Sequence, residues 1–261
     1  MWNPYATLEP RQKQVLAAVT VVIVLVAWSG LSVVVGPNKL PAPWAVAKAF
    51  LFLAWDAEAG ESVLLEATLR SLSRILVSGM LVVGVGLPLG ILMGASPRLN
   101  AALSPLLDPF RSAPVVAVLP ILIIWLGIGE ASKIAFLFMG AVVYLIPMVR
   151  DAVQAVPSTY YVSARDLGAT PWEAVRHSVV PIAMPRIADA IIVSVSVMWT
   201  YITVAEYTSN TPGLGNILQR AQRSFAMDQV FVGLFVIIAL ALVTYQGMLF
   251  LKSKLYPWEV E

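Results

Sequence analysis

Cysteine is absent from the sequence, and histidine occurs once, at His177. These two shortages exclude a disulfide framework, a cysteine–histidine zinc site, a haem-attachment motif and a thiol nucleophile. Charged residues are also scarce, at 12% of the chain, against about 25% in ordinary soluble domains. The net charge of +2 is small and dispersed, which argues against nucleic acid as a partner. No paired carboxylates, nucleophile–base pair or metal ligands gather at a matched spacing, so we predict no catalytic residue and no metal site.

Hydrophobic residues, in contrast, make up 59% of the chain. A membrane span needs about 20 mainly apolar residues, because the hydrocarbon core is roughly 30 Å thick and a helix rises about 1.5 Å per residue. Six apolar runs are candidates, and they cover residues 15–35, 75–95, 113–129, 134–149, 187–205 and 230–251. The charged sequence GEASK at 129–133 separates the third and fourth runs, which we interpret as a hairpin of two spans. The sequence therefore predicts an all-α integral membrane protein with about six transmembrane helices.

The first apolar run is longer than the roughly 7 to 15 residues of a signal peptide, and no A-x-A site follows it, so we expect an uncleaved span. With the N-terminus inside, ten Lys and Arg residues fall in inside segments and seven in external ones, of which four lie in the long segment 36–74. Long segments count less in the positive-inside rule, so both termini are predicted to be cytoplasmic. The predicted parts are a cytoplasmic segment at 1–14, a first span at 15–35, an external loop at 36–68 with a short helix near 43–55, a five-span core at 69–251 and a cytoplasmic tail at 252–261.

Gly86, Gly90 and Gly94 repeat at every fourth residue in the second span. Small residues at this spacing let two helices approach closely in lipid. The partner is another span of this chain or a second copy, and we favour packing within the chain.

A polar strip at 158–187 interrupts the apolar pattern before the fifth span. Ser158 can cap a first short helix, which ends at Gly168, a residue suited to the left-handed position after a helix. The run T-P-W-E at 170–173 then forms a capping box that begins a second helix, with Trp172 on the same face as two later valines. Pro181 and Pro185 are predicted to end this helix. We call residues 158–187 the elbow. Composition alone fits either a helix pair lying flat on the lipid headgroups or a structure that docks into a soluble partner.

The run S-A-R-D-L-G-A at 163–169, with Pro181 thirteen residues after Gly168, resembles the cytoplasmic "EAA" loop of ABC-importer permeases. Val162 occupies the position of the glutamate in that pattern. The resemblance implies that the elbow is a coupling helix inserted into a groove on the ATPase. The residues that it assigns to this contact are Ser163, Ala164, Arg165, Gly168, Ala169, Trp172 and Pro181.

Two other stretches narrow the resemblance. RSAPVVAVLPILIIWLGIGEASK at 111–133 and AEYTSNTPGLGNIL at 205–218 resemble segments of the permeases that import nitrate, sulfonates, taurine or bicarbonate. This group implies a type I (MetI-like) permease fold in the inner membrane. It also implies three protein partners besides the lipid bilayer: an ATP-binding subunit, an external substrate-binding protein and a second permease copy, which we expect to form a homodimer. The solute is then a small anion such as a sulfonate, taurine, nitrate or bicarbonate.

The chain has no G-x-x-x-x-G-K-[ST] phosphate loop and contains no Gly-Lys pair. It is therefore not expected to be an enzyme or to bind a cofactor, and ATP must be bound and hydrolysed by a partner chain.

Five residues are candidates for the wall of the transport pathway, because they lie in or beside the irregular third run, or in the fifth span and at its external end. They are Arg111, Pro120, Trp125, Trp199 and Glu206. An alternative function is an ion-coupled carrier or channel that works without an ATPase and uses Asp189 and Glu206 as its relay. Both acids, and Arg70 and Arg74 where the chain enters the second span, lie near span ends, where capping or snorkelling also explains them.

Overall fold

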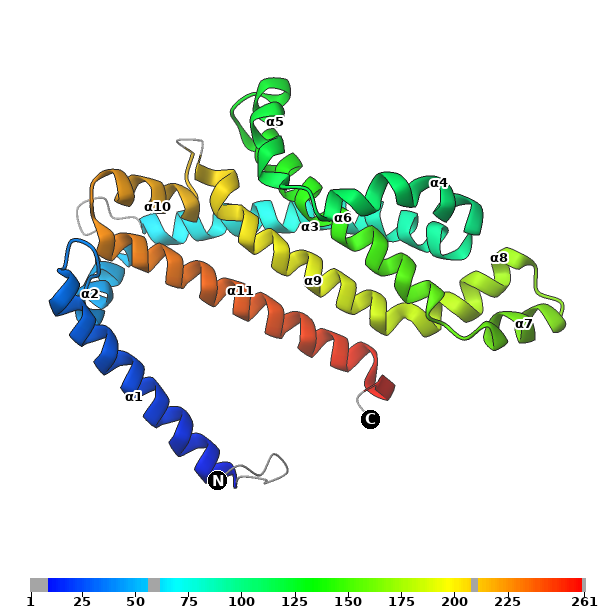
Figure 1. Ribbon diagram of the computed structural model, residues 1–261, viewed down its shortest axis with the longest axis horizontal. Coiled ribbons are helices and arrows are strands. Elements are labelled where there is room, and N and C mark those ends of the chain that lie inside the picture. The colour runs from blue at the N-terminus through cyan, green and yellow to red at the C-terminus, as the bar shows by residue number, and fades with distance from the viewer. Residues whose placement is uncertain (1–8, 56–61, 208–210, 260–261) are drawn as a thin grey trace. The chain divides into compact units, whose positions relative to one another are not determined.

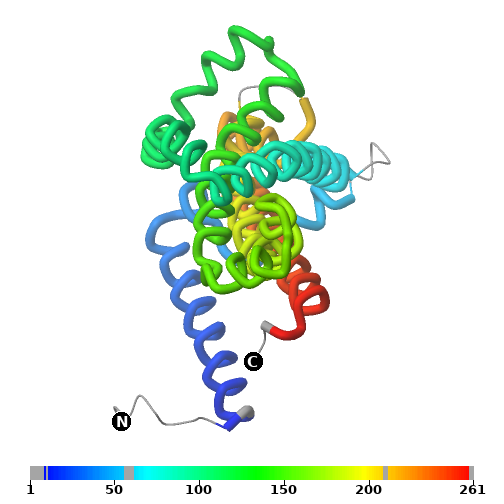
Figure 2. Tube along the Cα trace, turned by 90° about the vertical axis from the view of Figure 1, so that its right-hand side faces the viewer, coloured from blue at the N-terminus to red at the C-terminus, as the bar shows by residue number. Residues whose placement is uncertain are grey.

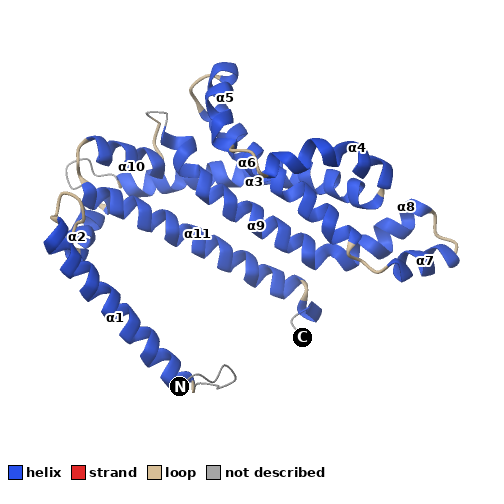
Figure 3. Cartoon of the chain, viewed as in Figure 1, coloured by secondary structure: helices blue, strands red, loops and turns tan. Residues whose placement is uncertain are grey.

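The computed structural model describes residues 9–55, 62–207 and 211–259, and every regular element in these ranges is helical (Figures 1 and 3). Parts of the predicted N-terminal segment (1–8), the external loop (56–61), the AEYTSNTPGLGNIL stretch (208–210) and the tail (260–261) lie outside the described residues. The α-helices are α1 (Pro10–Val35), α2 (Pro43–Ala54), α3 (Val63–Ala95), α4 (Pro97–Leu107), α5 (Leu119–Leu126), α6 (Glu130–Gln154), α7 (Ser158–Asp166), α8 (Pro171–Ala174), α9 (Val180–Tyr207), α10 (Leu214–Arg223) and α11 (Met227–Leu255). Short 3₁₀ turns form η1 (Asp108–Arg111), η2 (Val115–Val118) and η4 (Pro257–Glu259), and η3 (Val175–Val179) is a π-helix.

The chain divides into two compact units, Met1–Val63 with Leu218–Leu234 and Leu64–Ile217 with Phe235–Glu261. In the smaller unit, the indole N–H of Trp28 donates a hydrogen bond to the carbonyl of Pro41 at 3.0 Å, which ties the end of α1 to the chain before α2. The Trp28 ring also stacks on Phe231 with the ring centroids 5.9 Å apart. Helix α2 confirms the short helix predicted near 43–55.

Five helical segments are long and apolar enough to cross a membrane, and they cover Arg11–Val35, Val63–Ala95, Glu130–Gln154, Pro171–Tyr207 and Met227–Leu255. Each contains one of the six predicted apolar runs, so five of those runs are confirmed as parts of long helices.

The predicted span at 113–129 is wrong as a single straight helix. It contains η2 and the eight-residue α5, which together form the helical segment Val115–Leu126. This segment is bent by 96° from the preceding helical segment, Pro97–Arg111. Proline explains the break, because Pro114 has no N–H to continue a helix and disfavours helical backbone at Ala113. Gly127, with a φ of +78°, ends α5. A sixth span at this position is therefore a broken one.

Helix α6 is the centre of the larger unit. Its side chains Phe136, Leu137, Leu145 and Val149 have no exposed surface, and it packs along α9 (Figures 1 and 2). Helix α11, in contrast, buries few of its apolar side chains, as expected for a span that faces lipid or a protein partner.

The glycine ladder of α3 packs on α6 of the same chain, as predicted. A Cβ atom added to Gly86, Gly90 or Gly94 would lie 2.9, 2.7 or 2.6 Å from the nearest atom of Leu145, Val149 or Val153 of α6. Real Cβ atoms do not approach so closely, so these three positions need glycine for the two helices to touch.

Gly90→Ala is expected to lower the free energy of unfolding by about 1–3 kcal/mol, because the added methyl overpacks the helix contact. The clash includes backbone, since the new Cβ would lie 2.9 Å from the carbonyl oxygen of Ile146. The thermal midpoint in detergent, followed by circular dichroism, measures the effect. Gly30→Ala is the matched control, because a Cβ atom there meets nothing within 4 Å. Equal midpoints for the two variants would contradict the close contact of α3 with α6.

Candidate functional site

The elbow begins with α7, whose end is closed by a glycine. Gly168 has a φ of +93°, and its N–H bonds to the carbonyl of Arg165 at 3.0 Å, while the N–H of Ala169 bonds to the carbonyl of Ala164 at 3.1 Å. This pair of bonds is the Schellman motif, and it confirms the predicted role of Gly168. The predicted cap at Ser158 is wrong: the preceding proline occupies the cap position, and Ser158 is the first residue of the helix.

The second half of the elbow begins with the predicted capping box. The hydroxyl of Thr170 accepts a bond from the N–H of Glu173 at 3.3 Å, and the carboxylate of Glu173 accepts one from the N–H of Thr170 at 2.7 Å. Helix α8 then continues through η3 into α9 as one helical segment. The prediction that Pro181 and Pro185 end this helix is wrong. The bonding at η3 widens, so that the N–H of Val180 reaches back to Val175, and the helix continues past both Pro181 and Pro185.

The elbow exposes apolar side chains. Leu167, beside the glycine turn, is 89% exposed, and Trp172 is 52% exposed, whereas Val175 and Val179 are buried. Trp172 therefore does not share the buried face of the two valines as the helical spacing predicted, because it lies in the first turn of α8, before the chain meets its neighbours. Among the other predicted coupling residues, Ser163, Arg165, Gly168 and Pro181 are exposed, and Ala164 and Ala169 are half-buried.

At its opposite end, α9 carries a fully buried carboxylate. Glu206 has no exposed surface, and its Oε1 accepts bonds from Nη1 of Arg74 at 2.6 Å and from the hydroxyl of Ser71 at 2.7 Å. Its Oε2 accepts the backbone N–H of Gly215 at 2.8 Å. Arg74 is itself only 2% exposed, so both charges of this pair are removed from solvent. A buried carboxylate is tolerated only when such a set of donors replaces its hydration.

Two residues of α6 extend the pair to a cluster of four charges. Both carboxylate oxygens of Glu130 accept bonds from Arg74, at 2.7 Å from Nε and 2.6 Å from Nη2. The ammonium group of Lys133 lies 3.5 Å from Glu130 and donates a hydrogen bond to Thr211. We call Arg74, Glu130, Lys133 and Glu206 the ionic cluster. Its two positive and two negative charges balance.

The G-L-G turn at 213–215 fits against this cluster only because it lacks side chains. A Cβ atom on Gly213 would lie 2.6 Å from Nη1 of Arg74, and one on Gly215 would lie 2.8 Å from the carbonyl oxygen of Thr203. Glycine at both positions therefore lets the turn reach Glu206, to which Gly215 donates its N–H.

The ionic cluster fastens α3, α6, α9 and the start of α10 at one end of the larger unit. Snorkelling, one of the two simple explanations of Arg74 and Glu206 from sequence, is wrong, because neither side chain reaches solvent. Capping holds for Glu206, which accepts the N–H of Gly215 in the first turn of α10. All three nitrogens of the guanidinium group donate to carboxylates, a geometry that arginine provides and lysine does not.

The second acid of the alternative relay lies far from this cluster. Asp189 pairs with Lys252 of α11 at 2.7 Å. On helix α9 it precedes Glu206 by seventeen residues, which corresponds to about 25 Å of helix. The two acids therefore have separate basic partners at well-separated positions on one helix, an arrangement that does not support a proton or ion relay between them.

The five pathway candidates do not form one site around Glu206. Arg111, Pro120 and Trp125 lie on the bent segment between α4 and α6, where all three are exposed, Trp125 by 76%. Trp199 is on α9, two turns before Glu206, and is buried; its indole N–H has no hydrogen-bond partner within the described part of the chain. The residues that surround Glu206 come instead from α3 and the G-L-G turn.

Sequence reasoning missed Glu130 and Lys133 as cluster members, because their short charged sequence was interpreted as a surface turn. Their signal was present but weak: Glu130 and Lys133 are three residues apart at the beginning of an apolar helix, so both point to one face. Arg74 and Glu206 are also ionisable groups at span ends, and together with Glu130 and Lys133 their charges balance. This balance was the one sequence feature that could have grouped the four residues.

Comparison with known proteins gives matches over most of the chain. Residues 86–255 match the family described as "Binding-protein-dependent transport system inner membrane component". The taurine transport system permease protein TauC of Escherichia coli (strain K12) is 31% identical over 258 residues, which cover 97% of this chain and 93% of TauC. The putative aliphatic sulfonates transport permease protein SsuC of Bacillus subtilis (strain 168) is 29% identical over 188 residues, or 72% of this chain and 68% of SsuC. A chain of the inward-facing MetNI methionine ABC transporter superposes with a TM-score of 0.66 at 23% identity, covering 74% of this chain and 95% of that one, which shows a shared fold.

Glu206→Gln is expected to destabilise the protein by about 3–5 kcal/mol, because it leaves a buried arginine with only the half-exposed Glu130 as its charged partner. The thermal midpoint of the purified chain measures this. Glu66→Gln is the matched control, since Glu66 is exposed on α3. The double variant Arg74→Gln/Glu206→Gln is expected to lose less than the sum of its single variants. Equal midpoints for Glu206→Gln and Glu66→Gln would show that the buried pair contributes nothing.

Proposed function

The chain belongs to the family of binding-protein-dependent transport system inner membrane components and is a permease subunit of an ABC importer, and we propose that the solute it carries is a small organic sulfonate such as taurine. The observation that supports this solute most directly is the 31% identity to a taurine permease across 97% of the chain. A second match to a sulfonate permease points to the same class of solute. Membership of the family places the chain in the inner membrane and implies an ATP-binding subunit and a substrate-binding protein.

The elbow is the part of the chain suited to contact the ATP-binding subunit, and ATP is bound and hydrolysed by that subunit. Leu167, which is 89% exposed in the glycine turn after α7, and Trp172, which is half-exposed in the first turn of α8, form an apolar knob in the elbow before α9. Exposed apolar groups presented by an amphipathic helix are the usual means of docking into a groove. Since α8, η3 and α9 form one segment, a displacement of the knob moves α9 with it.

The ionic cluster carries this displacement to the far end of the spans. Arg74, Glu130 and Glu206 tie α3, α6 and α9 together through bonds of 2.6 to 2.7 Å, and the glycine ladder holds α3 on α6. These helices therefore move as one body when the elbow moves. The cluster is a fastening in this account, and neither Glu206 nor Asp189 transfers protons.

A second copy of the chain completes the assembly, with the termini and the elbow on the cytoplasmic side. The positive-inside count supports the orientation. The exposed apolar side chains of α5, among them Ile124 at 80% and Trp125 at 76%, support a further protein contact, because the bent segment that carries them leaves polar backbone ends that lipid does not satisfy.

Uptake of radiolabelled taurine into proteoliposomes tests the function. We expect uptake only when this chain, its ATP-binding subunit, a binding protein and ATP are all present. Omission of ATP is the control for leak. Flux through this chain alone, abolished by Asp189→Asn, would contradict the coupled importer and support the ion-coupled carrier.

Leu167→Asp is expected to reduce the amount of ATP-binding subunit that co-purifies with this chain by about tenfold or more, because it places a charge in an apolar contact. The fold itself is expected to be unchanged, since the side chain touches little of its own chain. Leu167→Met, which conserves volume and polarity, is the control. Undiminished co-purification of Leu167→Asp would contradict the docking role of the elbow.

A further inference from the structure

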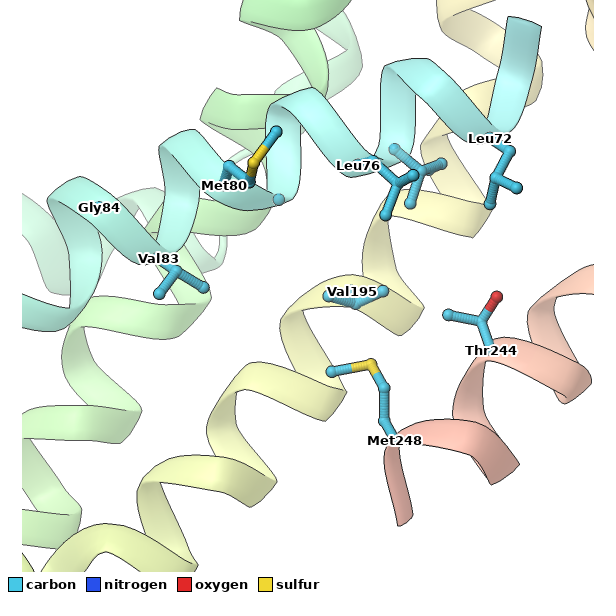
Figure 4. Close-up of a pocket in the computed structure, with 10 residues that line it drawn as sticks. Leu72, Leu76, Met80, Val83, Gly84, Val195, Thr244 and Met248 are labelled. Carbon is cyan, nitrogen blue, oxygen red and sulfur yellow. The ribbon is translucent and has the colours of Figure 1, made fainter. Parts of the chain in front are cut away.

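An apolar cavity of about 560 Å³ opens between α3, α9 and α11 in the larger unit (Figure 4). Leu76, Met80 and Val83 point into it from α3, Val195 from α9, and Met248 from α11. Thr244 supplies a hydroxyl, but this group donates to the carbonyl of Leu240 in its own helix at 2.7 Å. The lining therefore has nothing to replace the hydration of a sulfonate, and the cavity is not suited to the transported anion.

A second, smaller cavity continues the first between α9 and α11. It measures about 170 Å³, and Met248 lines both cavities, so the two adjoin at this side chain. The smaller cavity extends from Ile192 along the helices to Lys252 and Tyr256. Together the two cavities form a groove, which we call the α9–α11 groove, that is apolar along its length and reaches the end of α11.

The end of the groove is polar and basic. Lys252 is the one charged residue of the described lining, and it pairs with Asp189. Lys254 and Arg186 are exposed near this end outside the lining, and Nζ of Lys254 lies 5.6 Å from the centre of the Phe250 ring. Three positive charges and one negative charge leave an excess of two positive charges among these four residues. The rings of Tyr256 and Trp258 pack edge to face beside them, with centroids 5.5 Å apart. Aromatic and basic residues in this order after an apolar span are typical of the membrane surface.

From this arrangement we propose that the α9–α11 groove binds an anionic phospholipid of the bilayer, with an acyl chain along the two cavities and the phosphate group at the basic end. The groove is open and lies among helices long and apolar enough to span a membrane, and an unfilled groove would lose dispersion contacts along its whole lining. Basic clefts between transmembrane helices recognise anionic headgroups in the same way. The excess positive charge at one end and the uniformly apolar lining match the two parts of a lipid molecule.

A single substitution can fill the groove with a side chain of the protein. Gly84 lines the larger cavity, and a Cβ atom added there meets nothing within 4 Å, so Gly84→Leu starts from open space and extends a side chain into the groove. Gly30→Leu is the matched control, because Gly30 is also open but lies on α1. Lys254→Glu tests the headgroup separately, since Lys254 is exposed beyond the cavity.

The experiment is native mass spectrometry of the full transporter, delipidated and then titrated with phosphatidylglycerol or phosphatidylcholine. We expect phosphatidylglycerol to bind the parent protein and Gly30→Leu equally, and Gly84→Leu at least about tenfold more weakly, as for the loss of two buried methylene groups. Lys254→Glu is expected to remove the preference for phosphatidylglycerol over phosphatidylcholine.

Two results would overturn the proposal. One is equal binding of phosphatidylglycerol to Gly84→Leu and Gly30→Leu. The other is a protein occupant, which Gly84→Cys detects because the parent chain has no cysteine: a disulfide between two copies, or a cross-link to a second cysteine placed on α1 in the same chain, would show that a helix covers the groove.

Discussion

The fully buried pair of Arg74 and Glu206 is the interaction on which the larger unit depends. Two charges removed from solvent are costly unless every donor and acceptor is matched, and here the arginine uses its three nitrogens on two carboxylates. The match requires α3, α6 and α9 to hold one relative position, because each contributes one side chain. It also requires glycine at 213 and 215, where any larger residue would push the turn away from the pair.

This constraint determines which helices of the larger unit move together. Helix α9 has 28 residues, about 42 Å of helix, and it joins the elbow at one end to the buried pair at the other. The π-helix before Pro181 keeps the elbow and the span in one helical segment. In the proposed importer, the soluble motor therefore acts on one end of a body whose far end is closed by ion pairs, and the glycine ladder prevents α3 from sliding along α6.

Local features were predictable from the sequence, because they depend on residues close together in the chain. The capping box at Thr170 and the glycine turn at Gly168 are both present as predicted. Five of the spans could also be predicted from the length of their apolar runs, since that length depends only on the residues of the run itself. The family resemblance supplied the fold and the function, which neither length nor periodicity contains.

The contacts between distant residues were not predictable in this way. Glu206 is 132 residues from Arg74 in sequence, and only the folded chain shows that they meet. Proline was misinterpreted in both directions: Pro181 continues a helix because a π turn precedes it, whereas Pro114 breaks an apolar run that was long enough to span. Hydropathy counts residues and does not register whether the backbone bonds on either side of a proline are satisfied elsewhere.

The central claim is that the buried pair makes α3 and α9 move as one body, and a distance measurement across their outer ends tests it most directly. Spin labels on Glu66→Cys and Tyr207→Cys of one copy, with the second copy unlabelled, report that distance by pulsed electron paramagnetic resonance in the assembled transporter, because the chain has no other cysteine. The account predicts the same narrow distance distribution without nucleotide and with trapped ATP, and a broadened one when Glu206→Gln is added. A distribution that shifts with ATP in the otherwise unaltered chain would contradict the claim.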